Sequence, residues 1–148
     1  MAAAFPLLRS AEVGDAGRIA ALSGQLGYPA TPEVIRERLR LLATQGEPPV
    51  LVALVNGEVV GWAQVGRTLS LEAGAQAILL GLVVDAACRG RGIGAALVGA
   101  AEAWARRQGL AVLRVRTNTT RTDTHRFYAN LGFEEVKRQV VFRKDLGA

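Results

Sequence analysis

Residues 82–94 constrain the fold of this chain more than any other stretch. An apolar run ends at Asp85, and the glycine-rich sequence from Arg89 to Gly94 (Arg-Gly-Arg-Gly-Ile-Gly) then opens a long helical pattern. Glycines at the start of a helix leave its first backbone N–H groups uncovered, and the helix end adds partial positive charge. Arg89 and Arg91 add full charges. The stretch therefore predicts a strand, a loop and a helix arranged to hold a phosphate or pyrophosphate group.

Hydrophobic patterning predicts the elements on both sides of this loop. Residues 76–85 are almost all apolar, which predicts a central strand buried on both faces. Gly81 inside that strand indicates a bulge or a close approach of another backbone segment. Residues 93–108 predict a helix that ends at Gly109. Its expected inward face consists of Ile93, Leu97, Ala100, Ala101 and Trp104.

The N-terminal part predicts one strand and two helices. Residues 7–9 are expected to form the strand, and residues 16–27 show helical spacing of apolar side chains. Thr31 is expected to cap a second helix that has Pro32 at its first position. Residues 46–49, with two prolines and a glycine, are expected to end that helix.

The middle of the chain predicts a β-hairpin. Residues 50–55 and 58–65 are rich in β-branched side chains, and Asn56-Gly57 lies between them. Asn-Gly supplies the two positive φ angles of a tight hairpin turn. Residues 66–74 are expected to be a loop, in which the conformation of Leu69 and Leu71 stays open.

The C-terminal part predicts a strand, a short helix and two closing strands. Residues 110–117 form the expected strand, and Thr122 or Asp123 can cap the helix. Residues 135–136 and 139–145 are expected to close the sheet. Alternating helices and strands of this kind are typical of an α/β (α+β) fold.

Length and hydropathy indicate one globular domain over residues 1–148. The chain has 148 residues, of which 50% are hydrophobic, so it can bury a sizeable core. No uncharged apolar run approaches the roughly 18 residues that span a bilayer, so we expect no membrane association. The first residues lack the basic region of a signal peptide.

The numbers of cysteines and histidines and the distribution of charge argue against a disulfide-bonded, a metal-binding and a nucleic-acid-binding protein. A single cysteine, Cys88, allows no internal disulfide and is typical of a cytoplasmic protein. With one histidine and one cysteine, no protein-built metal site is expected. The net charge is +5, but the 18 basic residues are spread along the chain, so we expect no nucleic-acid partner.

Two other phosphate-binding motifs fit the glycine loop less well. A P-loop needs a lysine and a hydroxyl residue after its last glycine, and Gly94 is followed by neither. The dinucleotide fingerprint is formally matched by Gly90, Gly92 and Ala95. It also needs a ribose-binding carboxylate about twenty residues later, and residues 109–117 contain none.

The loop, the elements around it and a second motif resemble the GCN5-related N-acetyltransferase (GNAT) superfamily. Residues 89–94 match that family's Gln/Arg-x-x-Gly-x-Gly/Ala signature, which follows a strand and opens a helix. Residues 127–133 (Phe-Tyr-Ala-Asn-Leu-Gly-Phe) are similar to its late Tyr-x-x-x-Gly-Phe motif. Residues 9–11 with Asp15-Ala16 resemble its first strand and the start of its first helix. Two motifs at this separation are more specific than either alone.

The resemblance implies a fold and a cofactor. The expected fold is a mixed, mostly antiparallel sheet of about six to seven strands with about four helices, splayed between the fourth and fifth strands. Acetyl-CoA would bind through its pyrophosphate to the main chain of Arg89, Gly90, Arg91, Gly92, Ile93 and Gly94. The pantetheine arm would pair with the open strand edge at Leu82, Val83 and Val84. An N–H group around Leu82 or Val83 would polarise the thioester carbonyl.

Tyr128 is the expected general acid. The family's tyrosine at this position protonates the departing CoA thiolate. Asn118, at the end of a strand, is a candidate contact for pantetheine, although an asparagine there equally suits a turn. His125 could act as a base, although a lone histidine at a helix start is more often structural or solvated. Cys88 has no base beside it and is not expected to be a nucleophile.

The sequence does not identify the residue that acts as general base. Many family members carry a glutamate on the central strand, and residues 78–81 contain none. Glu33, Glu37, Glu72 and a chain of water molecules remain candidates. Residues 121–124 replace the family's frequent Asn-x-x-Ala, which leaves Arg121 or Arg126 as a possible partner of a CoA phosphate.

The resemblance implies direct transfer of acetyl from acetyl-CoA to a primary amine within a ternary complex. The acceptor could be a small metabolite, an aminoglycoside-like compound or a peptide amine. The alternative is an acyl-CoA-binding module without catalysis, which the missing base would explain. A homodimer through the terminal strands is also possible.

Overall fold

The computed structural model describes residues 5–45 and 50–147. It divides into two compact units, Met1–Val115 and Arg116–Ala148. The predicted end of the second helix at residues 46–49 lies outside the described residues. One domain over the whole chain stays a prediction.

The first unit holds a five-stranded sheet in the order β1-β2-β3-β4-β5. Neighbours from β1 to β4 are antiparallel, and β5 runs parallel to β4. The strands are β1 (Leu7–Ser10), β2 (Val50–Val55), β3 (Glu58–Ser70), β4 (Gly74–Val84) and β5 (Leu113–Val115). The helices are α1 (Ala16–Leu26), α2 (Pro32–Ala43), α3 (Ile93–Arg107) and, in the second unit, α4 (Thr122–Asn130), with short 3-10 turns η1 (Val13–Asp15) and η2 (Ala86–Cys88). This confirms the mixed α/β class, with four α-helices among the described residues.

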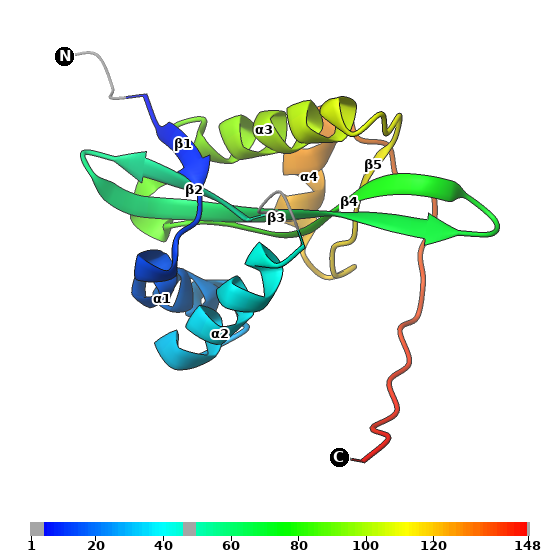
Figure 1. The fold of residues 1–148 in the computed structure, drawn as a ribbon. Helices are drawn as coiled ribbons and strands as arrows, with labels where there is room; N and C mark the ends of the chain where they lie inside the picture. Colours follow the sequence, from blue (N-terminus) through cyan, green and yellow to red (C-terminus); the bar gives the residue numbers. More distant parts are fainter. Residues whose placement is uncertain (1–4, 46–49, 148) are drawn as a thin grey trace. The chain divides into compact units, whose positions relative to one another are not determined.

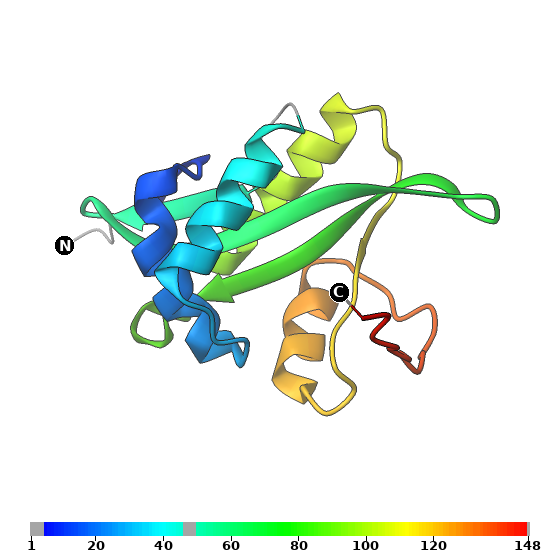
Figure 2. The same cartoon turned by 60° about the horizontal axis from the view of Figure 1, so that its bottom comes forward.

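Helices cover both faces of the sheet in the first unit. Figure 1 shows α1 and α2 on one face and α3 on the other, and Figure 2 shows α1 and α2 side by side. Each helix buries an apolar stripe, as its sequence spacing predicts. The α1–α2 core contains Ile19, Leu22, Ile35, Leu39, Val52, Val59 and Val83, and α3 buries Ile93, Leu97, Val98, Ala101 and Ala105.

A partly buried ion pair joins β1 to the start of α1. The Arg9 guanidinium donates to both carboxylate oxygens of Asp15, at 2.8 Å and 3.0 Å. Asp15 Oδ2 also accepts the Glu12 N–H at 2.7 Å. Chiefly because of the bond from Arg9, the pKa of Asp15 lies below its usual value, although burial opposes this shift. The two residues that resembled the family's first strand and helix start are therefore in contact.

Two local predictions in the N-terminal part are confirmed. Thr31 Oγ1 accepts the Val34 N–H at 3.2 Å, which caps α2 with Pro32 at its first position. Asn56 and Gly57 adopt positive φ angles of 52° and 79° in the turn between β2 and β3. These short-range signals were sufficient because each depends on residues that are adjacent in the sequence.

The predicted loop at residues 66–74 is wrong for most of its length. Strand β3 continues to Ser70 and β4 begins at Gly74, so the two strands form a long ribbon. Its outer end pairs Arg67 with Ala77 and Ser70 with Gly74. This pairing could not be predicted from the sequence, because the segment is rich in small and polar residues. Hydrophobic alternation indicates only those strands that cover a core.

The predicted C-terminal strands are also corrected. Strand β5 spans three residues rather than 110–117, because its pairing with β4 is limited to that stretch. No strand is assigned within residues 133–147, so the described sheet has five strands instead of six or seven. Strand propensity alone does not form a strand, since the backbone needs a partner. Here Val136, Val140, Val141 and Phe142 are all at least 75% exposed.

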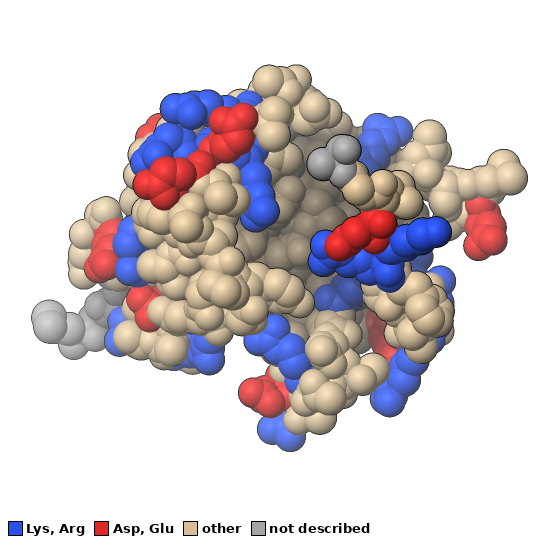
Figure 3. Space-filling view, turned by 90° about the horizontal axis from the view of Figure 1, so that it is seen from below, with Lys and Arg blue, Asp and Glu red and all other residues tan. Residues whose placement is uncertain are grey.

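Charges are interspersed over the face shown in Figure 3. Basic and acidic side chains lie there in several separate groups. Among the described residues, no helix is long and apolar enough to cross a membrane. The same residues contain no group of three His, Cys, Asp or Glu side chains that could hold a metal ion.

Candidate functional site

Strand β4 is distorted where the sequence predicts it. Its register against β3 shifts between Gln64, which faces Gly81, and Val65, which faces Leu79. Leu80 therefore has no partner and forms a bulge. A Cβ on Gly81 would lie 2.8 Å from the tip of the Trp62 indole. The predicted bulge is present at Leu80, one residue before Gly81, whereas the group that closely approaches Gly81 is the Trp62 side chain and not another backbone segment.

Beyond the bulge, one edge of β4 has no strand partner among the residues that the structure describes. Pairing of β4 with β5 ends at Leu79 and Val115. On the other side, the Asp85 N–H bonds to the Val60 carbonyl of β3 at 2.7 Å. Main-chain groups alternate in direction along a strand. Those of Leu82 and Val84 therefore face away from β3.

Val83 differs from its two neighbours. By the same alternation its main-chain groups face β3, where Trp62 is its partner, and its side chain is 4% exposed. Of the two N–H groups predicted to polarise a thioester, the one of Leu82 is therefore better placed. The contact itself stays a prediction.

The glycine loop follows β4 through the turn η2. Gly90 and Gly92 have φ angles of 80° and 79°, a conformation that side chains with a Cβ adopt at a cost. Gly92 precedes α3, and no side chain caps this helix start. Among the described residues, no acceptor is recorded for the N–H groups from Arg89 to Ala95. The loop thus presents several uncommitted N–H groups at a positive helix end.

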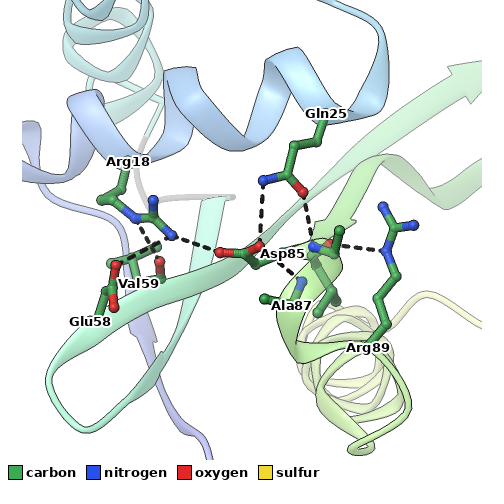
Figure 4. Close-up of polar contacts among 9 residues, drawn as sticks. Arg18, Gln25, Glu58, Val59, Asp85, Ala87 and Arg89 are labelled. Carbon is green, nitrogen blue, oxygen red and sulfur yellow. Dashed lines mark hydrogen bonds and ion pairs between the residues drawn. The ribbon is translucent and has the colours of Figure 1, made fainter.

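The two arginines of the loop are exposed. Arg89 Nε donates to the Val84 carbonyl at 3.3 Å, and this bond leaves its terminal nitrogens available (Figure 4). Arg91 is exposed one residue before the helix cap. Both side chains can reach solvent-borne anions without breaking a core contact.

The second unit buries Tyr128. This side chain lies on α4, is 7% exposed, and makes edge-on contacts with the rings of Phe127 and Phe133. Burial raises the pKa of Tyr128 to about 12, although the nearby Arg121 charge partly opposes the shift. The hydroxyl is therefore protonated at neutral pH and can donate a proton.

Asn118 and His125 form a local cluster in the second unit. Asn118 Oδ1 accepts from the N–H and the hydroxyl of Thr120, at 3.1 Å and 2.9 Å. The Asn118 carbonyl lies 2.8 Å from His125 Nε2. Because a carbonyl can only accept, Nε2 carries a proton there. Both residues thus stabilise the turn before α4, which is the structural interpretation of each.

The candidate bases are not in buried positions. Glu33, Glu37 and Glu72 are exposed, and the one buried carboxylate among the described residues is Asp15, which is paired with Arg9. Cys88 is a partly exposed free thiol. Within the described part of the chain, no buried side chain is therefore identified as the general base.

Sequence patterning missed the polar contacts that hold the turn after β4. Asp85 caps η2, and its carboxylate contacts Arg18 and Gln25 of α1 (Figure 4). An aspartate directly after an apolar run could have been recognised as a cap. Its partners on α1 are too distant in the sequence for any local signal.

Comparison with known proteins establishes the family. The model of the acetyltransferase (GNAT) family matches residues 20–133, which include both the glycine loop and Tyr128. The chain belongs to the GNAT family. It is an acetyl-CoA-dependent N-acetyltransferase, so the alternative of a non-catalytic module is not supported.

Two relatives extend the match of this GNAT protein over most of its length. An aminoglycoside N(6')-acetyltransferase type 1 of Stenotrophomonas maltophilia is 31% identical over 99% of the chain and 97% of the relative. One of Serratia marcescens is 30% identical over 86% and 90%. The solved structure of aminoglycoside N-acetyltransferase AAC(6')-Iy in complex with CoA has a TM-score of 0.86, covers 97% of both chains and is 19% identical, so it shows the fold.

Proposed function

We propose that this GNAT protein transfers an acetyl group from acetyl-CoA directly to a primary amine of an aminoglycoside-like acceptor. The observation that carries the proposal is the continuous path from the open edge of β4 to the glycine loop. Leu82 and Val84 face away from β3, and the uncommitted N–H groups follow from Arg89 onward. A pantetheine amide and a pyrophosphate need these two kinds of partner in this order.

The cofactor would be held mainly by main-chain groups. The pyrophosphate would accept bonds from the loop N–H groups, with Gly90 and Gly92 keeping side chains out of its way. Arg89 and Arg91 would add charge-assisted bonds. The pantetheine amides would pair with Leu82 and Val84 as a further strand would. Acetyl-CoA is thereby assigned as the cosubstrate.

In the proposed reaction, the acceptor nitrogen attacks the thioester carbon and the carbon–sulfur bond breaks. The Leu82 N–H would stabilise the negative carbonyl oxygen of the tetrahedral intermediate. Tyr128 would give its hydroxyl proton to the departing CoA sulfur. The acceptor nitrogen loses its extra proton to water, since the one buried carboxylate among the described residues, Asp15, is already paired with Arg9.

The acceptor class rests on the two relatives that acetylate aminoglycosides. Their similarity extends over the N-terminal helices as well as the cofactor loop, because it covers most of the chain. An aminoglycoside amine is therefore favoured over a small metabolite or a peptide amine. A cytoplasmic location and a homodimer belong to the same proposal; the single cysteine supports the first.

Thiol release tests the proposed function. The protein is incubated with acetyl-CoA and, separately, with aminoglycosides, small amino metabolites and peptides, while free CoA thiol and the acetylated product are followed. We expect release that requires an aminoglycoside. Release with another amine alone would reassign the acceptor, and tight CoA binding without turnover would contradict catalysis.

A further inference from the structure

A polar cluster in the first unit connects α1 to the turn that precedes the glycine loop. It consists of Arg18 and Gln25 of α1 together with Asp85, which follows β4 (Figure 4). Asp85 Oδ2 accepts from Arg18 at 3.1 Å, and Oδ1 accepts from Gln25 Nε2 at 3.4 Å. Arg18 Nε also donates to the Val59 carbonyl at 3.0 Å. The cluster thus fixes helix, hairpin and turn to one another.

The same cluster holds the backbone of the turn. Gln25 Oε1 accepts the Ala86 N–H at 2.9 Å, and Asp85 Oδ1 accepts the Ala87 N–H at 3.1 Å. The Cys88 N–H bonds to the Asp85 carbonyl at 2.8 Å. Three consecutive N–H groups are therefore committed to protein acceptors.

The uncommitted N–H groups begin directly after these three. Among the described residues none is recorded with an acceptor from Arg89 to Ala95. The turn thus marks the boundary between backbone used by the protein and backbone open to a ligand. Its conformation sets the direction in which the next N–H groups point.

Asp85 also places a negative charge close in sequence to the glycine loop, which is proposed to bind an anionic pyrophosphate. Its pKa is lowered, first by the Ala87 N–H and then by Arg18, so the carboxylate is ionised at neutral pH. Arg18 supplies the opposite charge, with Glu58 at 3.6 Å as a second, looser partner. Without Arg18, the Asp85 carboxylate would oppose a bound pyrophosphate.

We propose that Gln25 and Arg18 are positioning residues for the cofactor: Gln25 aligns the turn before the glycine loop, and Arg18 neutralises Asp85 beside it. This inference rests on the proposed function, since it assumes that the loop holds a pyrophosphate. Neither side chain needs to touch acetyl-CoA. Helix α1 thereby influences cofactor affinity through the turn at residues 85–88.

The test compares two acetyl donors, acetyl-CoA and S-acetylpantetheine, which lacks the pyrophosphate. Gln25→Ala removes the acceptor of the Ala86 N–H, and we expect the KM for acetyl-CoA to rise about fivefold to tenfold, as for one lost hydrogen bond. The KM for S-acetylpantetheine should not change. Gln139→Ala, an exposed glutamine after α4, is the matched control and should leave both values unchanged.

A second comparison of variants tests whether Arg18 neutralises the charge of Asp85. Arg18→Ala should weaken binding of CoA several-fold, with a smaller loss at high ionic strength because salt screens the Asp85 charge. The double variant Arg18→Ala/Asp85→Asn should bind CoA more tightly than Arg18→Ala alone. If the two residues acted independently, the affinity losses of the two single variants would add in the double variant.

The outcomes separate this inference from the proposed function. Failure of the wild-type protein to bind CoA would contradict the proposed function itself. If the wild type binds CoA but Gln25→Ala affects both donors equally, or neither, the positioning role is wrong. If Arg18→Ala and Asp85→Asn losses simply add, neutralisation of Asp85 is wrong.

Discussion

The Trp62 indole covers Gly81 so closely that a Cβ on Gly81 would lie 2.8 Å from two atoms of the ring. The two residues lie on β3 and β4, next to the Leu80 bulge. The indole is the large side chain that Gly81 makes room for, and a displaced ring would disturb the strand edge proposed for pantetheine.

Gly81→Ala should therefore destabilise the protein by about 1–3 kcal/mol, the usual range for overpacking. Denaturant unfolding measures this loss. Gly99→Ala is the matched control, because Gly99 lies in α3 with open space around it. That change should add about 0.5–1 kcal/mol of stability. Equal effects of the two substitutions would show that the Trp62 contact is unimportant.

Asp15→Asn should reduce the stability at pH 7 by about 1–2 kcal/mol, because it removes a charged partner of Arg9. The pKa of Asp15 is lowered in the folded protein from its ordinary value of 3.8. Its contribution is therefore present above about pH 4 and is lost as the pH falls through the folded pKa. Unfolding measured from pH 7 to pH 2 should show a shallower decline for the variant.

The exposed pair of Asp145 with Arg143 provides the control for this prediction. Asp145→Asn should change the free energy of unfolding by less than about 0.5 kcal/mol, since surface ion pairs contribute little. An acid profile of Asp15→Asn identical to that of the wild type would contradict the role given to the Arg9 pair.

Tyr128→Phe should lower kcat about a hundredfold or more, the effect of removing a general acid, while CoA binding is retained. Because burial raises the pKa of Tyr128 to about 12, the wild-type rate should show no alkaline decline from this group below about pH 11. The rate should instead rise with pH as the acceptor amine loses its proton.

Steady-state rates from pH 6 to pH 10 test this account of Tyr128. Tyr28→Phe is the control, since that side chain is 72% exposed, and its rates should equal those of the wild type. A Tyr128→Phe variant with wild-type kcat would show that another group protonates the thiolate.

The sequence predicted elements whose signals are local. The Thr31 cap, the Asn56-Gly57 turn and the Arg89–Gly94 loop each depend on residues next to one another. Gly81 was also informative, because a glycine in an apolar strand has few explanations.

The errors arose where structure depends on distant partners. Residues 67–70 form a strand because residues 74–77 pair with them, although their side chains show no core pattern. Residues 139–145 have strand propensity but no recorded partner strand. The contacts of Asp85 with α1 cross about sixty positions of sequence, which no periodicity reveals.

The most direct test of the central claim is calorimetric titration of CoA into Gly92→Ala and Gly109→Ala. Both glycines have positive φ angles, 79° and 73°, with open space at the Cβ position, so both variants bear similar backbone strain. Only Gly92 belongs to the glycine loop. We predict that Gly92→Ala weakens CoA binding at least tenfold while Gly109→Ala binds like the wild type. Equal affinities for both variants, or a wild type that binds NADP instead of CoA, would contradict the claim that residues 89–94 hold the CoA pyrophosphate.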